Sequence, residues 1–226
     1  MLTFWIVTAA FVLTVCLAFG WRTASRYWQL PCPSLLAWAL ESRFYQRMSG
    51  TETTLDCMHL RPGQRILEIG PGPGRLLIPA AKRVLPGGEA VGIDIQPGMV
   101  ERLRKRAAEA GAANLIAILG DGTKSHFEAD SFDLVCLVTT LGEIPDRRAA
   151  LQQSFKALKP GGVLSVTEIF GDPHYQSNAT VRRLAESVGF VPESVHGSWW
   201  FFTANFVKPT SSGLMPHLPV HVEDAG

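Results

Sequence analysis

A carboxylate followed by alternating glycines is the part of the sequence best suited to hold a ligand. Glu68 precedes Gly70, Gly72 and Gly74 in an E-x-G-x-G-x-G run. Glycine has no Cβ, so this backbone can turn sharply and let a ligand approach it closely. Arg75 stands where a dinucleotide fingerprint has its last glycine, and no Gly-Lys-Ser/Thr follows. A carboxylate beside the turn suits a cationic ligand better than a phosphate.

Two aspartates follow later apolar runs and extend this group of candidate ligand-binding residues. Asp94 closes a predicted strand over 89–94, and Asp121 follows a predicted strand over 115–119. An acid at the end of the second strand can accept both hydroxyls of a ribose, although it can also cap the next helix. Asp121 can likewise be a turn aspartate.

Alternating apolar runs and helical segments must position these side chains. Strands predicted to alternate with helices indicate an α/β fold with a largely parallel sheet, and the last two strands form a closing pair. The predicted strands are 65–69, 89–94, 115–119, 132–138, 163–168, 191–195 and 199–207, and the predicted helices are 54–60, 76–84, one beginning at 97, 147–158 and 177–188.

The combined motifs resemble those of the class I S-adenosylmethionine (SAM)-dependent methyltransferases, over about residues 50–207. The resemblance rests on the E-x-G-x-G-x-G run, on Asp94, and on Lys-Pro-Gly-Gly at 159–162 before the fifth strand. It is strongest toward the small-molecule branch that includes ubiquinone and menaquinone methylases. It implies a Rossmann-like seven-stranded sheet with one reversed strand, and SAM as the cofactor.

The resemblance also implies roles for individual residues. Glu68 and the three glycines would form the cofactor loop, Asp94 would bind the ribose, Ile95 would lie against the adenine, and Asp121 would accept a hydrogen bond from the adenine amino group.

Methyl transfer from a sulfonium is an in-line displacement, so positioning and exclusion of water can supply much of the catalysis. A general base is needed only if the acceptor must lose a proton. Candidates near the ends of the fourth and fifth strands are Glu143, Glu168 and His174. Histidine titrates near pH 6.5, which suits a base, but each of these residues can also have a purely structural role.

Composition limits the other classes of function. The chain of 226 residues has a net charge of +1, which does not favour nucleic acid as a partner. The four cysteines have no metal-ligand spacing, so we expect no metal site.

The N-terminal segment predicts a membrane anchor. Residues 2–20 carry no charge and would form a helix of about 28 Å, close to the thickness of a bilayer core. The first arginines follow this segment, which favours a retained single-pass span with the catalytic domain in the cytoplasm. A cleaved signal peptide is the alternative, but it lacks the usual basic start and cleavage site. The predicted divisions are an anchor over 1–21, a juxtamembrane segment with a helix over 35–48 within 22–50, a catalytic domain over 51–207 and a disordered tail over 208–226.

The sequence therefore predicts a membrane-anchored SAM-dependent methyltransferase that modifies a small, lipophilic acceptor such as a quinone-like phenol or a phospholipid amine. The alternative from another class is an inactive SAM-binding scaffold that holds a partner at the membrane.

Overall fold

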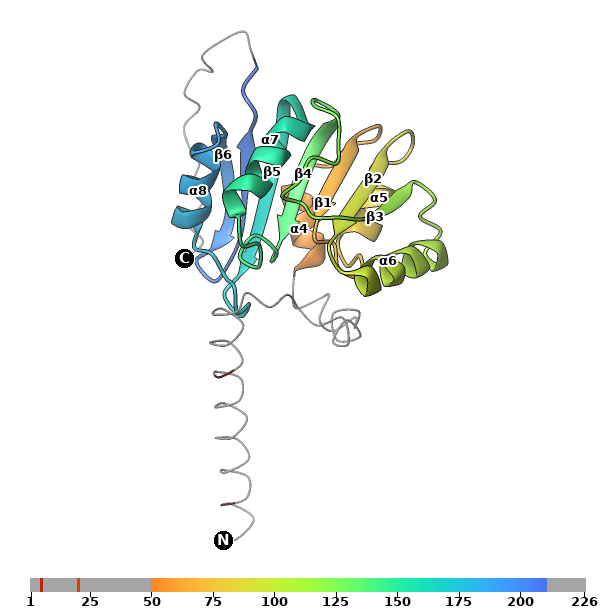
Figure 1. Cartoon of the computed structure of the whole chain (residues 1–226), viewed down its shortest axis with the longest axis horizontal. Helices are drawn as coiled ribbons and strands as arrows, with labels where there is room; N and C mark the ends of the chain where they lie inside the picture. The colour runs from red at the N-terminus through yellow and green to blue at the C-terminus, as the bar shows by residue number, and fades with distance from the viewer. Residues whose placement is uncertain (1–4, 6–19, 21–49, 211–226) are drawn as a thin grey trace.

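Short apolar runs, each ending in a polar turn, form the central sheet. The computed structural model describes Trp5, Gly20 and residues 50–210. Its seven strands lie side by side in the order β3-β2-β1-β4-β5-β7-β6 (Figure 1). They are β1 (Arg65–Ile69), β2 (Glu89–Asp94), β3 (Leu115–Leu119), β4 (Phe132–Val138), β5 (Leu158–Ile169), β6 (Val191–Ser198) and β7 (Phe201–Val207).

One strand of this sheet is reversed, as the sequence predicted. Strands β1 to β5 pair in parallel, whereas β7 is antiparallel to both of its neighbours, β5 and β6. The strand order changes direction at β1, which pairs with β2 on one side and with β4 on the other. In open α/β sheets this switch point, at the carboxyl ends of the strands, is where ligands bind.

Helices cover both faces of the sheet (Figure 1). Leu55, Leu77 and Leu103 of the first three helices belong to one buried cluster, and Leu151 and Val181 of the last two belong to the other. Both faces of β1, β2 and β4 are therefore buried, which explains why their sequences are continuous apolar runs, whereas the edge strand β3 exposes Ile116 and Leu119. The helices are α4 (Thr51–Cys57), α5 (Leu77–Arg83), α6 (Pro97–Glu109), α7 (Arg147–Ala157) and α8 (Asn178–Glu186).

The predicted turn over 159–162 is instead part of β5. The strand begins at Leu158 because this segment finds pairing partners on both sides. Leu158 pairs with Phe132, and the Gly161 N–H donates to the carbonyl of Lys208 at 2.8 Å. Helix α7 consequently ends one residue earlier than predicted, at Ala157.

Lys208 is fixed in the domain, although the sequence placed it at the start of a disordered tail. Its N–H donates to the Gly162 carbonyl at 2.9 Å. Its ammonium group donates to Asp130 Oδ1 at 2.6 Å and to the Leu158 carbonyl at 2.7 Å. The ordered chain therefore continues past the predicted boundary.

The predicted anchor over 2–20 and the predicted helix over 35–48 lie outside the described residues, apart from Trp5 and Gly20. Within the part that is described, no helix combines the length and the apolar character needed to span a bilayer.

Candidate functional site

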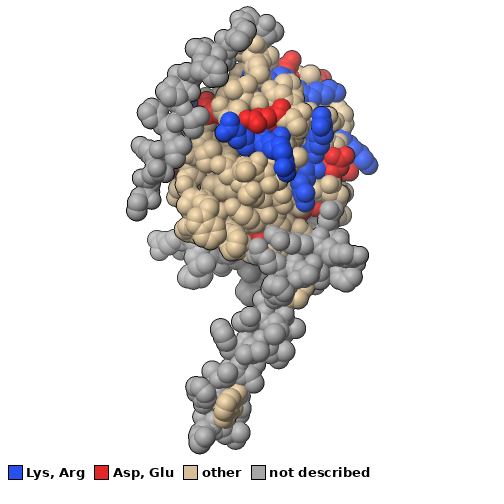
Figure 2. All heavy atoms as spheres, turned by 90° about the vertical axis from the view of Figure 1, so that its left-hand side faces the viewer, with Lys and Arg blue, Asp and Glu red and all other residues tan. Residues whose placement is uncertain are grey.

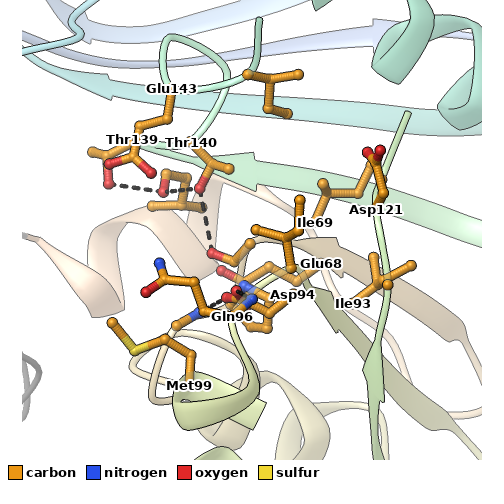
Figure 3. Close-up of a pocket in the computed structure, with 18 of the residues that line it drawn as sticks. Glu68, Ile69, Ile93, Asp94, Gln96, Met99, Asp121, Thr139, Thr140 and Glu143 are labelled. Carbon is orange, nitrogen blue, oxygen red and sulfur yellow. Dashed lines mark hydrogen bonds between the residues drawn. The ribbon is translucent and has the colours of Figure 1, made fainter. Parts of the chain in front are cut away.

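A cavity of about 470 Å³ opens at the carboxyl edge of the sheet, where the chain turns away from β1 and β4 (Figure 3). Its walls come from the glycine loop after β1, the ends of β2 and β3, and the loop after β4. These segments are far apart in sequence and meet only at the switch point of the sheet.

The three glycines of the loop have three different functions. All have positive φ angles, +70° at Gly70, +53° at Gly72 and +81° at Gly74. A Cβ on Gly70 would lie 2.4 Å from Thr140 Cγ2, so glycine is needed where the loop passes the end of β4. Gly72 lines the cavity, and a Cβ there would meet no atom within 4 Å.

Gly74 does not line the cavity, in contrast to the cofactor-binding role that we predicted for it. A Cβ on Gly74 would lie 2.4 Å from Leu103 Cδ1, so its absence lets the loop pack tightly on α6. Gly74 therefore positions the loop, and the earlier glycines form the wall of the cavity.

Asp94 both lines the cavity and holds its walls in place. Its Oδ2 accepts a hydrogen bond from the Gly72 N–H at 3.1 Å, and its Oδ1 accepts one from the Gln96 N–H at 2.9 Å. Burial raises the pKa of Asp94, although these hydrogen bonds favour the ionised form and oppose the shift. Asp94 therefore fixes the turn before α6 without capping the helix itself, and it remains available to a ligand in the cavity.

Glu68 is a buried carboxyl group with an unsatisfied oxygen. The residue is 2% exposed, lines the cavity, and its Oε2 has no hydrogen-bond partner. Burial raises the pKa of Glu68 to about 8, with a further increase from Asp94 and an opposing effect from Arg75. A cation brought next to Glu68 would favour its ionised form, so the site is built to respond to a positively charged ligand.

Ile95 and Asp121, which we predicted to contact the adenine, both line the cavity. Ile95 is 62% exposed and offers an apolar surface at the rim. Asp121 Oδ1 accepts hydrogen bonds from the Thr123 N–H at 2.9 Å and from its hydroxyl at 2.7 Å, which lower the pKa of Asp121. The aspartate therefore forms a local turn while also lining the cavity.

The structure separates the two predicted catalytic residues. Glu143 lines the cavity from the loop after β4. His174 is only 5% exposed and is not among the lining residues. Its N–H donates to Asp172 Oδ1 at 2.7 Å, and its carbonyl packs so closely on Gly142 that a Cβ there would lie 1.8 Å away. The structure thus places His174 behind the cavity loop and does not support its predicted role as a base.

Glu168, the third candidate base, is buried near Glu143 without lining the cavity. Its Oε2 accepts a hydrogen bond from the Gln176 N–H at 3.1 Å, and its Oε1 has no partner. Burial raises the pKa of Glu168 to about 8; Asp172 and Glu143 add to the shift, and Arg147 opposes it. The ionisation of Glu168 is therefore linked to the charges of Glu143 and Arg147.

Sequence reasoning missed the importance of Thr139 and Thr140. Both line the cavity directly after β4. Thr139 has a φ of +53°, which is a strained conformation for a β-branched residue. The Thr140 hydroxyl lies within hydrogen-bond reach of the carbonyls of Val138, at 3.0 Å, and Gly70, at 3.3 Å, and so connects the two strands that border the cavity. The only signal in the sequence was their position after a buried strand.

Comparison with known proteins agrees with this geometry. A family model described as a methyltransferase domain matches residues 66–162, from β1 into β5, and this range contains the entire cavity lining. The chain carries a SAM-dependent methyltransferase domain. Its fold is that of the class I enzymes, and its cofactor is S-adenosyl-L-methionine.

Two curated relatives and one solved structure illustrate the similarity. The chain is 41% identical over 113 residues to a nocamycin O-methyltransferase from Saccharothrix syringae, which covers 50% of this chain and 40% of the relative. It is 33% identical over 116 residues to a ubiquinone/menaquinone biosynthesis C-methyltransferase from Vibrio vulnificus. This match covers 51% of this chain and 45% of the relative. The chain thus spans less than half the length of these relatives. A SAM-dependent methyltransferase from Aquifex aeolicus superimposes with a TM-score of 0.73 at 18% identity, over 78% of this chain and 99% of that one.

The residues at the cavity fit this cofactor. SAM carries an ammonium group and a sulfonium, and the unsatisfied oxygen of Glu68 offers a buried acceptor or counter-charge. Asp94 offers a carboxylate at the end of β2, and Ile69, Ile93 and Ile95 offer apolar surface. The volume lies in the range of ordinary small-ligand sites.

Replacement of the glycines should separate folding from binding. We expect Gly74→Ala to lower the free energy of unfolding by about 1–3 kcal/mol, because the new methyl group meets Leu103 and the left-handed backbone is strained. Gly72→Ala adds only the backbone strain and should instead weaken SAM binding, because its methyl group faces open space in the cavity. Urea unfolding and calorimetric titration measure the two effects. Equal losses of stability in both variants would contradict this division of roles.

SAM affinity should depend on pH through Glu68. Because the pKa of Glu68 is about 8, its carboxyl group is mostly protonated at lower pH. A cationic ligand that pairs with the carboxylate must then displace this proton. Affinity should therefore rise from about pH 6 to about pH 8, by at most about tenfold per pH unit. Glu68→Gln should lose this component of the pH dependence while it retains any contribution from titration of SAM itself. Calorimetric titrations of both proteins across this range provide the test, and parallel pH profiles would rule out Glu68 as the origin.

Proposed function

We propose that the protein transfers a methyl group from SAM to a small, lipophilic acceptor, and that residues 2–20 hold it at a membrane. The observation that carries the proposal is the single cavity that joins the cofactor loop to the loop after β4. One compartment of this kind can hold a cofactor and an acceptor side by side, which is what a direct group transfer requires.

The chemistry of the cavity walls supports a small acceptor with an apolar body. Beyond the glycine loop, the lining includes Val138, Ile144 and Pro145, together with Thr139 and Glu143. The apolar side chains can exclude water, and the polar ones can orient one hydroxyl, enol or amine group. The names of the two curated relatives refer to nocamycin and to ubiquinone or menaquinone biosynthesis, which are consistent with acceptors of this type.

Bound SAM supplies an electrophilic methyl group. The residues of this chain then have to position the acceptor and, where necessary, remove its proton. Glu143 is the residue we assign to this second task, because it lines the cavity from the loop after β4. Its N–H donates to the Thr140 carbonyl at 3.0 Å, which fixes the start of the loop relative to the end of β4.

Membrane attachment rests on the sequence of the N-terminal segment. Residues 2–20 contain no charged side chain, and basic residues appear only from Arg22 onward. This pattern favours a single span with the domain on the cytoplasmic side. A tether of this kind would raise the local concentration of an acceptor that partitions into the bilayer.

Turnover is the decisive experiment for methyl transfer. The full chain, reconstituted in phospholipid vesicles with SAM and a lipid extract, should form S-adenosylhomocysteine together with a product heavier by one methylene, detected by mass spectrometry. A phenol with a long alkyl chain and its water-soluble parent phenol provide defined probes. SAM binding without any turnover on the extract or the probes would overturn the proposal and favour an inactive scaffold.

Replacement of Glu143 tests its assigned role as a base. With a phenolic acceptor, Glu143→Gln should lower kcat by about 10²-fold or more, since general-base catalysis contributes about 10²–10⁴-fold. SAM affinity should be unchanged. Glu128→Gln is the matched control, because Glu128 is exposed and does not line the cavity. An unchanged kcat in Glu143→Gln would mean that positioning alone drives the reaction.

A further inference from the structure

An exposed aromatic patch, made of Phe170, Tyr175, Trp199 and Trp200, lies on the domain outside the cavity. Trp199 is 70% exposed, Trp200 55% and Phe170 46%. The ring of Phe170 contacts that of Trp199 with centroids 5.1 Å apart, and that of Tyr175 at 5.5 Å. Phe170, Tyr175 and Trp199 therefore form a connected cluster of rings, and Trp200 is the next residue along the chain.

Backbone contacts hold the two segments of the patch together. The Phe170 N–H donates to the Trp200 carbonyl at 2.7 Å, and the Tyr175 hydroxyl donates to the Trp199 carbonyl. The loop after β5 and the turn between β6 and β7 are thus joined on the same side of the sheet. Aromatic side chains fixed in this way lose little further conformational entropy when they contact a partner.

The patch lies on the same edge of the sheet as the cavity. It follows the carboxyl ends of β5 and β6, and both strands run parallel to β1 and β4, whose carboxyl ends border the cavity (Figure 1). Ile95, at the cavity rim, also exposes an apolar side chain along this edge. The patch and the rim of the cavity therefore lie along one edge of the sheet.

Lys and Arg side chains are gathered on the upper half of the face that Figure 2 shows, and the tan surface left visible below them carries few charged side chains. Helix α8 carries exposed charges at Arg182, Arg183 and Glu186, away from the aromatic rings. An uncharged aromatic surface of this kind suits an apolar or amphipathic partner.

The chain enters the domain beside the patch. A Cβ on Gly50 would lie 2.8 Å from Phe201 Cζ, and Phe201 directly follows Trp200. The uncharged stretch over 2–20 is separated from this point by residues 21–49. Because 29 residues lie between the two, attachment through 2–20 alone would not determine which face of the domain meets a membrane.

We propose that the aromatic patch docks on the headgroup interface of a lipid bilayer and holds the cavity opening against it. Trp and Tyr combine an apolar ring with one polar group and concentrate at the interface between membrane and water. This inference rests on the proposed function, because it assigns the route by which a lipophilic acceptor enters the cavity. The linker brings the domain to the membrane, and the patch sets its orientation there.

Photocrosslinking tests the contact without relying on catalysis. The full chain carrying Trp199→p-benzoylphenylalanine is reconstituted in vesicles of phosphatidylcholine and phosphatidylglycerol, irradiated and analysed by mass spectrometry. Leu85→p-benzoylphenylalanine is the matched control, because Leu85 is also exposed but lies before β2, at the opposite edge of the sheet. We expect several-fold more lipid adduct at position 199 than at position 85. Equal yields would overturn the proposal, as would adducts at 199 only with residues 21–49 or with a second copy of the chain.

An activity measurement distinguishes this proposal from the proposed function. The double variant Trp199→Ala/Trp200→Ala should keep the SAM affinity and thermal unfolding of the parent protein. It should turn over a vesicle-bound long-chain phenol several-fold more slowly and the water-soluble phenol at the parental rate. Equal rates on both substrates would overturn the docking proposal and leave methyl transfer intact. Absence of turnover in the parent protein would overturn the proposed function, while the crosslinking result would still decide the docking.

Discussion

The close approach of the glycine loop to the end of β4 is the constraint on which the site depends. No side chain fits at Gly70, because Thr140 already occupies the space that a Cβ would need. The same threonine reaches the Gly70 carbonyl, and its neighbour Thr139 adopts a left-handed backbone to make the turn. Contacts between β1 and β4 therefore hold the strained backbone of Thr139 in place. The cavity lies immediately beyond this point, where the chain turns away from both strands.

Two buried carboxyl groups near this turn are costly to ionise. Glu68 and Glu168 follow the same pattern: each is almost fully buried, has one oxygen without a partner, and has a pKa raised to about 8. Removal of a carboxylate from water is unfavourable unless a compensating charge arrives. For Glu68 a bound cationic cofactor would provide that charge, so binding energy could offset a cost that folding leaves in place. Glu168 lies behind the loop that carries Glu143. The negative charge of Glu143 raises the pKa of Glu168, so the two carboxyl groups influence each other's ionisation.

Much of the fold could be predicted from local sequence, and the site only in part. The strands β1, β2 and β4 are buried on both faces, so their apolar runs identified them, and the spacing from the glycine run to Asp94 identified the end of β2. Gly74 was assigned to the cofactor because sequence shows only that a residue lacks a side chain, and not what fills the space. His174 follows β5 closely, but the direction in which that loop folds depends on its contact with Gly142. The strain at Thr139 and the bridging by Thr140 arise from tertiary contacts that have no local signature.

One hydrogen bond of the fold connects the start of the domain to the cavity wall. Arg75 lines the cavity, and its Nη1 donates to the hydroxyl of Thr51 at 3.0 Å. Thr51 is the first residue of α4 and directly follows Gly50, where the preceding chain joins the domain. A force along the preceding chain would therefore reach the cavity wall through Arg75, while the ion pairs of Arg83 with Glu52 and Asp56 would carry part of it to α5. If that chain is tethered to a membrane, as proposed, the cavity would be one of the points that bear load.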